Sequence, residues 1–236
     1  MVYGNPCCDR YCLNDELLWS GSPMAENNPD ARTALDAVRQ AIRRKDFVEA
    51  DRLAHGLQGP NTASYLPLAD LLIKSDYAGE SSRELDLRTG VHAVEGEGLR
   101  QRSFISDGLV IEYEFQAPTN LAIAIAPAHP RTETTIHDRR ILLSGRAPET
   151  TLPAEDAGEE FYAASDAEAL GSFYEVALEV EADVEPEETL WLPKEAPPLD
   201  YYGRGETTDR VHEHELAAIS LRGAKRVRIK LVSAVK

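Results

Sequence analysis

The sequence predicts a mainly β protein: a two-layer antiparallel β-sandwich of the super-sandwich type with a small inserted helical hairpin. Three observations predict this fold class. Apolar residues recur at helical spacing only over about residues 29–57. After Pro60 the period falls to two, as it does in strands. Several such strands close best as two stacked layers, so we expect a single domain spanning residues 1–236.

Two helices are predicted after an initial strand and loop over residues 1–26. Asn28-Pro29-Asp30 has the composition of a helix start, with Asn28 as the cap and Pro29 in the first helical position. The apolar stripe that follows comprises Leu35, Val38, Ala41 and Ile42. A second helix begins near Asp46, with Glu49 three residues on as in a capping box. Its apolar stripe comprises Phe47, Ala50, Leu53, Ala54 and Leu57, and its end is marked by Gly56, Gly59 and Pro60. We expect both stripes to pack on a sheet.

Alternating or short apolar runs then predict strands. Residues 109–115 alternate between apolar positions on one face and more polar positions on the other, and residues 121–126 and 141–143 are short apolar runs. The clearest strand is Tyr174–Val184, and the last is near Ala224–Val235. Residues 148–169 and 185–213 are rich in Pro, Glu, Gly and Asp and are predicted to be long loops.

Charge predicts which strands are neighbours. The outward face of the clearest strand is acidic, with Glu175, Glu179, Glu181 and Asp183, whereas that of the last strand is basic, with Arg226, Arg228 and Lys230. Opposite charges on neighbouring strands each contribute roughly 0.2–1 kcal/mol. We therefore predict that these two strands pair.

The composition excludes several classes of partner. Hydrophobic residues make up 42% of the chain, which is enough for a core. The net charge of -16 argues against nucleic acid and against a membrane surface as partners. The segment from Glu149 to Glu188 carries fourteen carboxylates and no Lys or Arg, and we interpret it as a solvated face.

No motif in the sequence predicts catalysis, a metal site or a cofactor. Cys7, Cys8 and Cys12 are expected to be reduced thiols without a positioned base. His212-Glu213-His214-Glu215 lacks a third metal ligand, and Gly90, Gly96 and Gly98 do not follow the strand-to-helix pattern of a phosphate loop. Met1 is followed directly by Val-Tyr-Gly-Asn-Pro, which is no signal peptide, so the chain as it stands is expected to be cytoplasmic.

Five segments in order carry a resemblance to a known family. Residues 13–23, Leu-Asn-Asp-Glu-Leu-Leu-Trp-Ser-Gly-Ser-Pro, resemble a signature of glycoside hydrolase family 95, which contains α-L-fucosidases, and Asn27-Asn28-Pro29 follows at the matching distance. The segments that resemble later parts of the family pattern are residues 47–53, 65–72, 83–90 and 141–148. The chain departs from the pattern at Asp15-Glu16-Leu17, Leu66 and Ala69. The resemblance covers nearly the whole chain and is tightest over residues 1–90.

The resemblance implies an accessory, non-catalytic domain. In the family this region is an N-terminal β-sandwich that precedes a catalytic (α/α)6 barrel. Such a barrel needs about twelve helices, over about 130 residues at about 11 each, whereas this sequence predicts two. We therefore expect no catalytic residue here, and a missing helical barrel or a carbohydrate as the partner. The strand that leads into Met1 is expected to be absent, leaving an open sheet edge, and the parent enzyme is expected to be secreted in some cases.

Asn14, Trp19 and Trp191 are the candidate residues for contact with carbohydrate or with another domain. Aromatic faces stack on sugars, but large aromatic side chains usually lie in a core or anchor an interface. Three hypotheses follow: an accessory domain of an α-L-fucosidase-like enzyme, a free-standing carbohydrate-binding module, and a truncated fragment without function.

Overall fold

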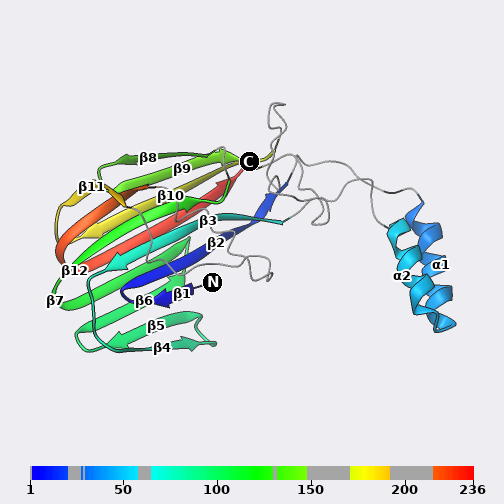
Figure 1. The fold of residues 1–236 in the computed structure, drawn as a ribbon, viewed down its shortest axis with the longest axis horizontal. Coiled ribbons are helices and arrows are strands. Elements are labelled where there is room, and N and C mark those ends of the chain that lie inside the picture. The colour runs from blue at the N-terminus through cyan, green and yellow to red at the C-terminus, as the bar shows by residue number, and fades with distance from the viewer. Residues whose placement is uncertain are drawn as a thin grey trace.

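The computed structural model describes residues 2–20, 28, 30–57, 65–129, 132–147, 171–191 and 215–236. Within these residues the protein consists of antiparallel strands and a pair of short helices (Figure 1). In chain order the helices follow the second strand and precede the third. The strands are β1 (Val2–Asn5), β2 (Cys8–Trp19), β3 (Tyr65–Ser75), β4 (Ser81–Asp86), β5 (Val91–Gly96), β6 (Leu99–Ile105), β7 (Leu109–Pro127), β8 (Thr132–His137), β9 (Arg140–Arg146), β10 (Phe173–Ala182), β11 (Pro186–Trp191) and β12 (Leu216–Val235). The helices are α1 (Ala31–Arg43) and α2 (Phe47–Ala54), and the 3-10 turn η1 (His55–Leu57) follows them.

Two long strands, β7 and β12, each belong to both layers. The first half of β7 pairs with β6 and its second half with β3. The first half of β12 pairs with β11 and its second half with β10. The register of β12 shifts between Leu221 and Arg226, where Gly223 has a φ of 70°, and such irregularities bend a strand. The first layer is therefore β1-β2-β3-β7-β12-β11, and the second layer is β4-β5-β6-β7-β12-β10-β9-β8.

One large apolar core lies between the two layers. It contains Leu71 and Ile123 from the first layer and Val176 and Ile229 from the second, and all four are fully buried. Full burial of each such aliphatic side chain contributes about 1.5–3 kcal/mol. The predicted fold class, an antiparallel β-sandwich with a small helical insert, is confirmed. The assignment of residues 1–236 to a single domain stays a prediction.

The predicted pairing of the two charged strands is also confirmed, with Glu179 on β10 opposite Lys230 on β12. Their side chains nevertheless contact other neighbours. Lys230 Nζ lies 2.8 Å from an Asp107 carboxylate oxygen, and Arg140 Nη2 lies 3.0 Å from a carboxylate oxygen of Glu179. Charges of alternating sign therefore run across the outer face of the second layer, and for the described acids the interpretation as a solvated face holds.

The prediction of a loop over residues 185–213 is wrong for the start of that range. Pro186–Trp191 forms β11, which pairs with β12 at the edge of the first layer. Pro186 stands at the first position of this strand, where its missing N–H costs no ladder bond. Residues 192–213 and the loop predicted over residues 148–169 lie outside the described residues.

The two helices pack on each other, so the expectation that their apolar stripes cover a sheet is wrong. Val38, Ala41 and Ala50 are buried where α1 faces α2, and the hairpin stands apart from the sandwich (Figure 1). The predicted cap of α2 is confirmed, because an Asp46 side-chain oxygen accepts from the Glu49 N–H at 3.2 Å. The α1 cap is Asp30 rather than Asn28.

Asn28 has a different role from the predicted one. Its Oδ1 accepts from the Asp30 N–H at 2.9 Å, and its Nδ2 donates to the Gly56 carbonyl at 2.8 Å. It therefore closes the open end of the hairpin. Pro29 lies outside the described residues. Neither described helix is long and apolar enough to span a bilayer.

Candidate functional site

Two of the three predicted contact residues, Asn14 and Trp19, are exposed on β2. Trp19 is 45% exposed and meets Tyr65, also 45% exposed, edge to face with ring centroids 5.3 Å apart. The indole Nε1 donates to the Glu16 carbonyl at 2.9 Å, which fixes the ring. Because Trp19 ends β2 and Tyr65 begins β3, the helical insert is flanked by an exposed aromatic pair. This surface can stack on a sugar ring or on another protein.

Trp191 lies elsewhere, and its ring is 9% exposed. It belongs to a second apolar cluster on the outer face of the first layer, with Cys8, Leu72, Ala124, Ala126 and Ala218. Among the described residues, its Nε1 has no hydrogen-bond partner. The structure does not bring Trp191 to Trp19. The contact roles of Asn14, Trp19 and Trp191 stay predictions.

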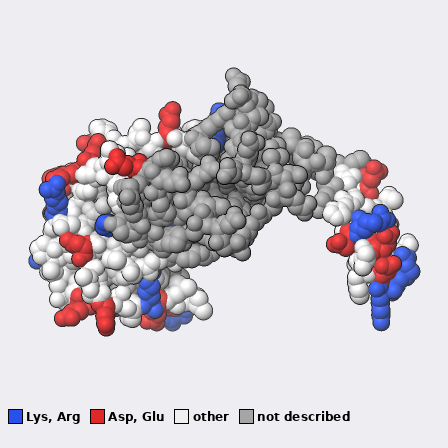
Figure 2. Space-filling model, viewed as in Figure 1, with Lys and Arg blue, Asp and Glu red and all other residues white. Residues whose placement is uncertain are grey.

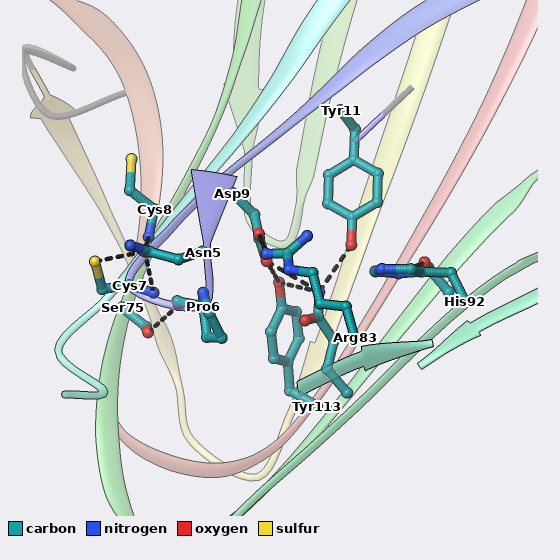
Figure 3. Close-up of polar contacts among 12 residues, drawn as sticks. Asn5, Pro6, Cys7, Cys8, Asp9, Tyr11, Ser75, Arg83, His92 and Tyr113 are labelled. Carbon is teal, nitrogen blue, oxygen red and sulfur yellow. Dashed lines mark hydrogen bonds and ion pairs between the residues drawn. The ribbon is translucent and has the colours of Figure 1, made fainter. Parts of the chain in front are cut away.

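A buried polar network that the sequence reasoning missed joins the two layers at the β4–β6 side of the core. Asp9 on β2 is fully buried, and its carboxylate pairs with the Arg83 guanidinium on β4. Gln101 on β6, also fully buried, lies with Nε2 3.1 Å from Asp9 Oδ2, 2.7 Å from Tyr11 OH and 3.0 Å from Tyr113 OH. Figure 3 shows the side chains of Asp9, Arg83 and Tyr113 converging. Strands of both layers are thus connected by polar contacts inside an apolar core.

Burial dominates the electrostatics of this network. It raises the pKa of Asp9 above its ordinary value, although Arg83 acts in the opposite direction. It raises the pKa of Tyr113, and the neighbouring Tyr11 and Asp9 add to that rise. Burial also lowers the pKa of His92, whose Nδ1 lies 3.1 Å from Ser103 Oγ. At neutral pH both tyrosines are therefore protonated and His92 is neutral.

A second buried ion pair lies on the other face of β2. Arg10 Nη2 is 2.6 Å from Asp70 Oδ2, and both side chains are almost fully buried. Asp70 lies opposite Cys12 in the strand register. Burial, with Asp70 nearby, raises the pKa of the Cys12 thiol to about 12. The thiol is therefore protonated at neutral pH and is a poor nucleophile. None of Cys7, Cys8 and Cys12 forms a disulfide.

The arrangement of these groups is suited to holding strands together. The buried carboxylates, Asp9 and Asp70, are each paired with a guanidinium, and glycoside hydrolysis needs two carboxyl groups facing each other across a sugar. Across the described ranges, no group of three or more His, Cys, Asp or Glu side chains could hold a metal ion. The candidate ligands His212 and His214 lie outside those ranges. Gly90 and Gly98 have φ values of 71° and 75° at the turns before and after β5, which is a turn role.

One signal in the sequence could have pointed to these buried groups. Asp9 and Arg10 are adjacent charged residues in the first half of β2, where the other residues over positions 8–13 are Cys, Tyr or Leu, and neighbours on a strand face opposite sides of the sheet. Each charge therefore had to find a partner on its own face. The partners Arg83 and Asp70 are 74 and 60 residues away along the chain, so the sequence alone did not identify them.

Comparisons with known proteins find similarity to glycoside hydrolases. The family model described as "Glycosyl hydrolase family 65, N-terminal domain" matches residues 1–186. A curated relative, "Alpha-L-fucosidase 2" of Arabidopsis thaliana, is 26% identical over 168 residues, which are 64% of this chain and 20% of the relative. The chain thus spans about a fifth of the length of that relative. The match supports a glycoside hydrolase N-terminal domain but names family 65 where the sequence resemblance named family 95. The chain belongs to the glycosyl hydrolase family 65 N-terminal domain family.

Proposed function

We propose that this chain is the accessory, non-catalytic N-terminal domain of an α-L-fucosidase-like glycoside hydrolase of family 95. In this role it packs against and supports a carbohydrate-cleaving (α/α)6 barrel. The observation that carries the proposal is the family match over residues 1–186, on a β-sandwich whose buried carboxylates are engaged in ion pairs. The similarity to the plant fucosidase and the signature over residues 13–23 support the finer assignment to family 95.

An assay on an aryl fucoside tests the non-catalytic part of this proposal. The purified full chain is expected to show no turnover above buffer, because the buried carboxylates of Asp9 and Asp70 are each engaged by a guanidinium, whereas glycoside hydrolysis needs two carboxyl groups facing each other across a sugar. The Arabidopsis alpha-L-fucosidase 2 serves as the active control. Clear turnover by the chain alone would contradict the proposal.

A carbohydrate-binding module is the second candidate, and the exposed Trp19–Tyr65 pair favours it. This function predicts heat of binding in calorimetry with fucosylated oligosaccharides. Trp19→Ala should abolish the signal and Trp19→Phe should retain part of it, because stacking needs an aromatic face. Trp191→Ala should act through stability instead, because Trp191 is buried. Absence of any heat with the wild-type chain would leave the accessory domain as the better proposal.

A third candidate, a truncated product without a stable fold, makes an opposite prediction about unfolding. A chain with the continuous core of this sandwich should unfold in one cooperative thermal transition. A broad, non-cooperative transition, seen by circular dichroism, would support the truncated product.

A further inference from the structure

We infer that the free end of the helical hairpin docks on an acidic surface of the helical barrel in the proposed enzyme. The hairpin tip is defined here as Ile42, Arg43, Arg44, Lys45, Phe47 and Val48. This inference rests on the proposed function and adds the surface through which the two parts meet.

The first argument is the exposure of large apolar side chains at the hairpin tip. Ile42 is 50% exposed, Phe47 67% and Val48 85%, all within seven positions around the turn between α1 and α2. The helices pack on each other through smaller residues, such as Ala41 and Ala50. The tip residues are therefore not needed to close the hairpin. Single exposed apolar residues are ordinary, but a cluster of them marks an interaction surface.

The second argument is that the hairpin presents this tip as a fixed shape. Asp46 caps α2, and Asn28 Nδ2 donates to the Gly56 carbonyl at the opposite end. A Cβ atom at Gly56 would lie 3.0 Å from the Ala34 Cβ, so α1 and η1 approach closely there. Because the hairpin stands apart from the sandwich in Figure 1, its tip is open to a partner.

The third argument is charge. The chain has a net charge of -16, yet residues 39–45 contain four cationic side chains and no acidic one. Figure 2 shows Lys and Arg gathered over the free end of the hairpin. In the part of the chain that the structure describes, no salt bridge involves Arg43, Arg44 or Lys45. A surface that is both cationic and apolar fits a partner surface that is acidic with an apolar hollow.

A protein surface made of helices fits this tip better than the alternatives. A polyanion or an anionic membrane is repelled by the rest of the chain. Helices pack on helices by fitting ridges into grooves, and a barrel of paired helices presents such grooves. The curated relative is about five times as long as the region that aligns with this chain, so a large further part of such an enzyme is available to carry the surface. A second copy of this chain is the competing occupant.

A chimera tests the inference. The region of the Arabidopsis alpha-L-fucosidase 2 that aligns with this chain is replaced by the full chain, and aryl fucoside turnover and thermal unfolding are measured. The tip variant is Phe47→Glu with Val48→Glu. Acidic residues in the first turn of α2 favour the helix, so this variant keeps the hairpin. The matched control is Leu87→Glu, because Leu87 is an 88% exposed apolar residue outside the hairpin.

The tip variant is expected to lower the unfolding temperature of the chimera by about 3–6 °C and to leave that of the isolated chain unchanged. The control should alter neither. Arg43→Glu with Arg44→Glu should lower the unfolding temperature of the chimera by less than the tip variant does. High salt should remove this difference between the double variant and the wild-type chimera.

Each other result decides against the inference in a different way. If the wild-type chimera is unfolded or inactive, the proposed function fails and the inference fails with it. If the wild-type chimera is active but the tip variant behaves like Leu87→Glu, only the inference is wrong. If sedimentation of the isolated chain shows a dimer that the tip variant dissociates, a second copy occupies the tip and the barrel does not.

Discussion

Replacing Gln101 by leucine should destabilise the protein strongly, because one fully buried amide connects three polar groups from two strands of the core. Leucine has a similar size but supplies no donor. Asp9 then keeps Arg83 but loses a charge-assisted bond from the Gln101 amide, and Tyr11 and Tyr113 lose a partner for their hydroxyl groups.

The magnitude follows from the number of bonds that the amide can make. Its nitrogen carries two hydrogens, so at most two of the three contacts are full hydrogen bonds at one time. A bond to a charged group contributes about 1.5–3 kcal/mol and a neutral one about 0.5–1.5 kcal/mol. Gln101→Leu should therefore cost about 2–4 kcal/mol. For a chain of this size that lowers the unfolding temperature by about 4–16 °C.

Urea unfolding followed by circular dichroism measures this cost. Gln116→Leu is the matched control, because Gln116 is exposed on β7, and its change should stay within about 0.5 kcal/mol. Adding Tyr113→Phe to Gln101→Leu should cost less than Tyr113→Phe does in the wild type, since the hydroxyl has already lost its partner. A loss below about 1 kcal/mol for Gln101→Leu would refute the view that the network holds the layers together.

Three further predictions follow from the same structure. Burial raises the folded-state pKa of Asp9, so the charged form of this carboxyl opposes folding at neutral pH. As the pH falls through that raised pKa, urea midpoints should therefore show the wild type gaining more stability than Asp9→Asn does. Equal gains by the two proteins would contradict this. Ile229→Ala should cost about 2–5 kcal/mol in chemical unfolding because the side chain is fully buried, whereas Leu190→Ala, 68% exposed, should cost under about 0.5 kcal/mol; similar losses would mean that the core is misplaced. Asp46→Ala should destabilise α2 by about 1 kcal/mol, and hydrogen exchange should report faster exchange of the Glu49 amide while β10 keeps its protection; an unchanged Glu49 rate would argue against the cap.

The strand assignments that succeeded rest on local alternation. Val176, Leu178 and Val180 share one face of β10 because side chains alternate along a strand, and that face had to be buried. The pairing of β10 with β12 was predictable because their outward charges are opposite. The chain at Pro186–Trp191 gave no such alternation and was predicted as loop. Its strand conformation depends on the ladder that β12 offers.

The helical insert shows a second kind of failure. The apolar spacing of α1 and α2 predicts that each helix buries a face, and each does. Spacing does not say what lies against that face, and the two helices bury theirs against each other. The exposed Phe47 was counted as part of this apolar stripe for the same reason.

The sequence by itself determined the fold class, the direction in which the strand faces point and the family resemblance, because these depend on the order and period of residues along one chain. Only the tertiary structure decided which distant residues meet. It placed Asp9 beside Arg83 and Gln101, buried Trp191 while leaving Trp19 exposed, and set the hairpin apart from the sheets. Partner choice depends on how the layers fold over each other, and residues that are 74 or 92 positions apart carry no local pattern that links them.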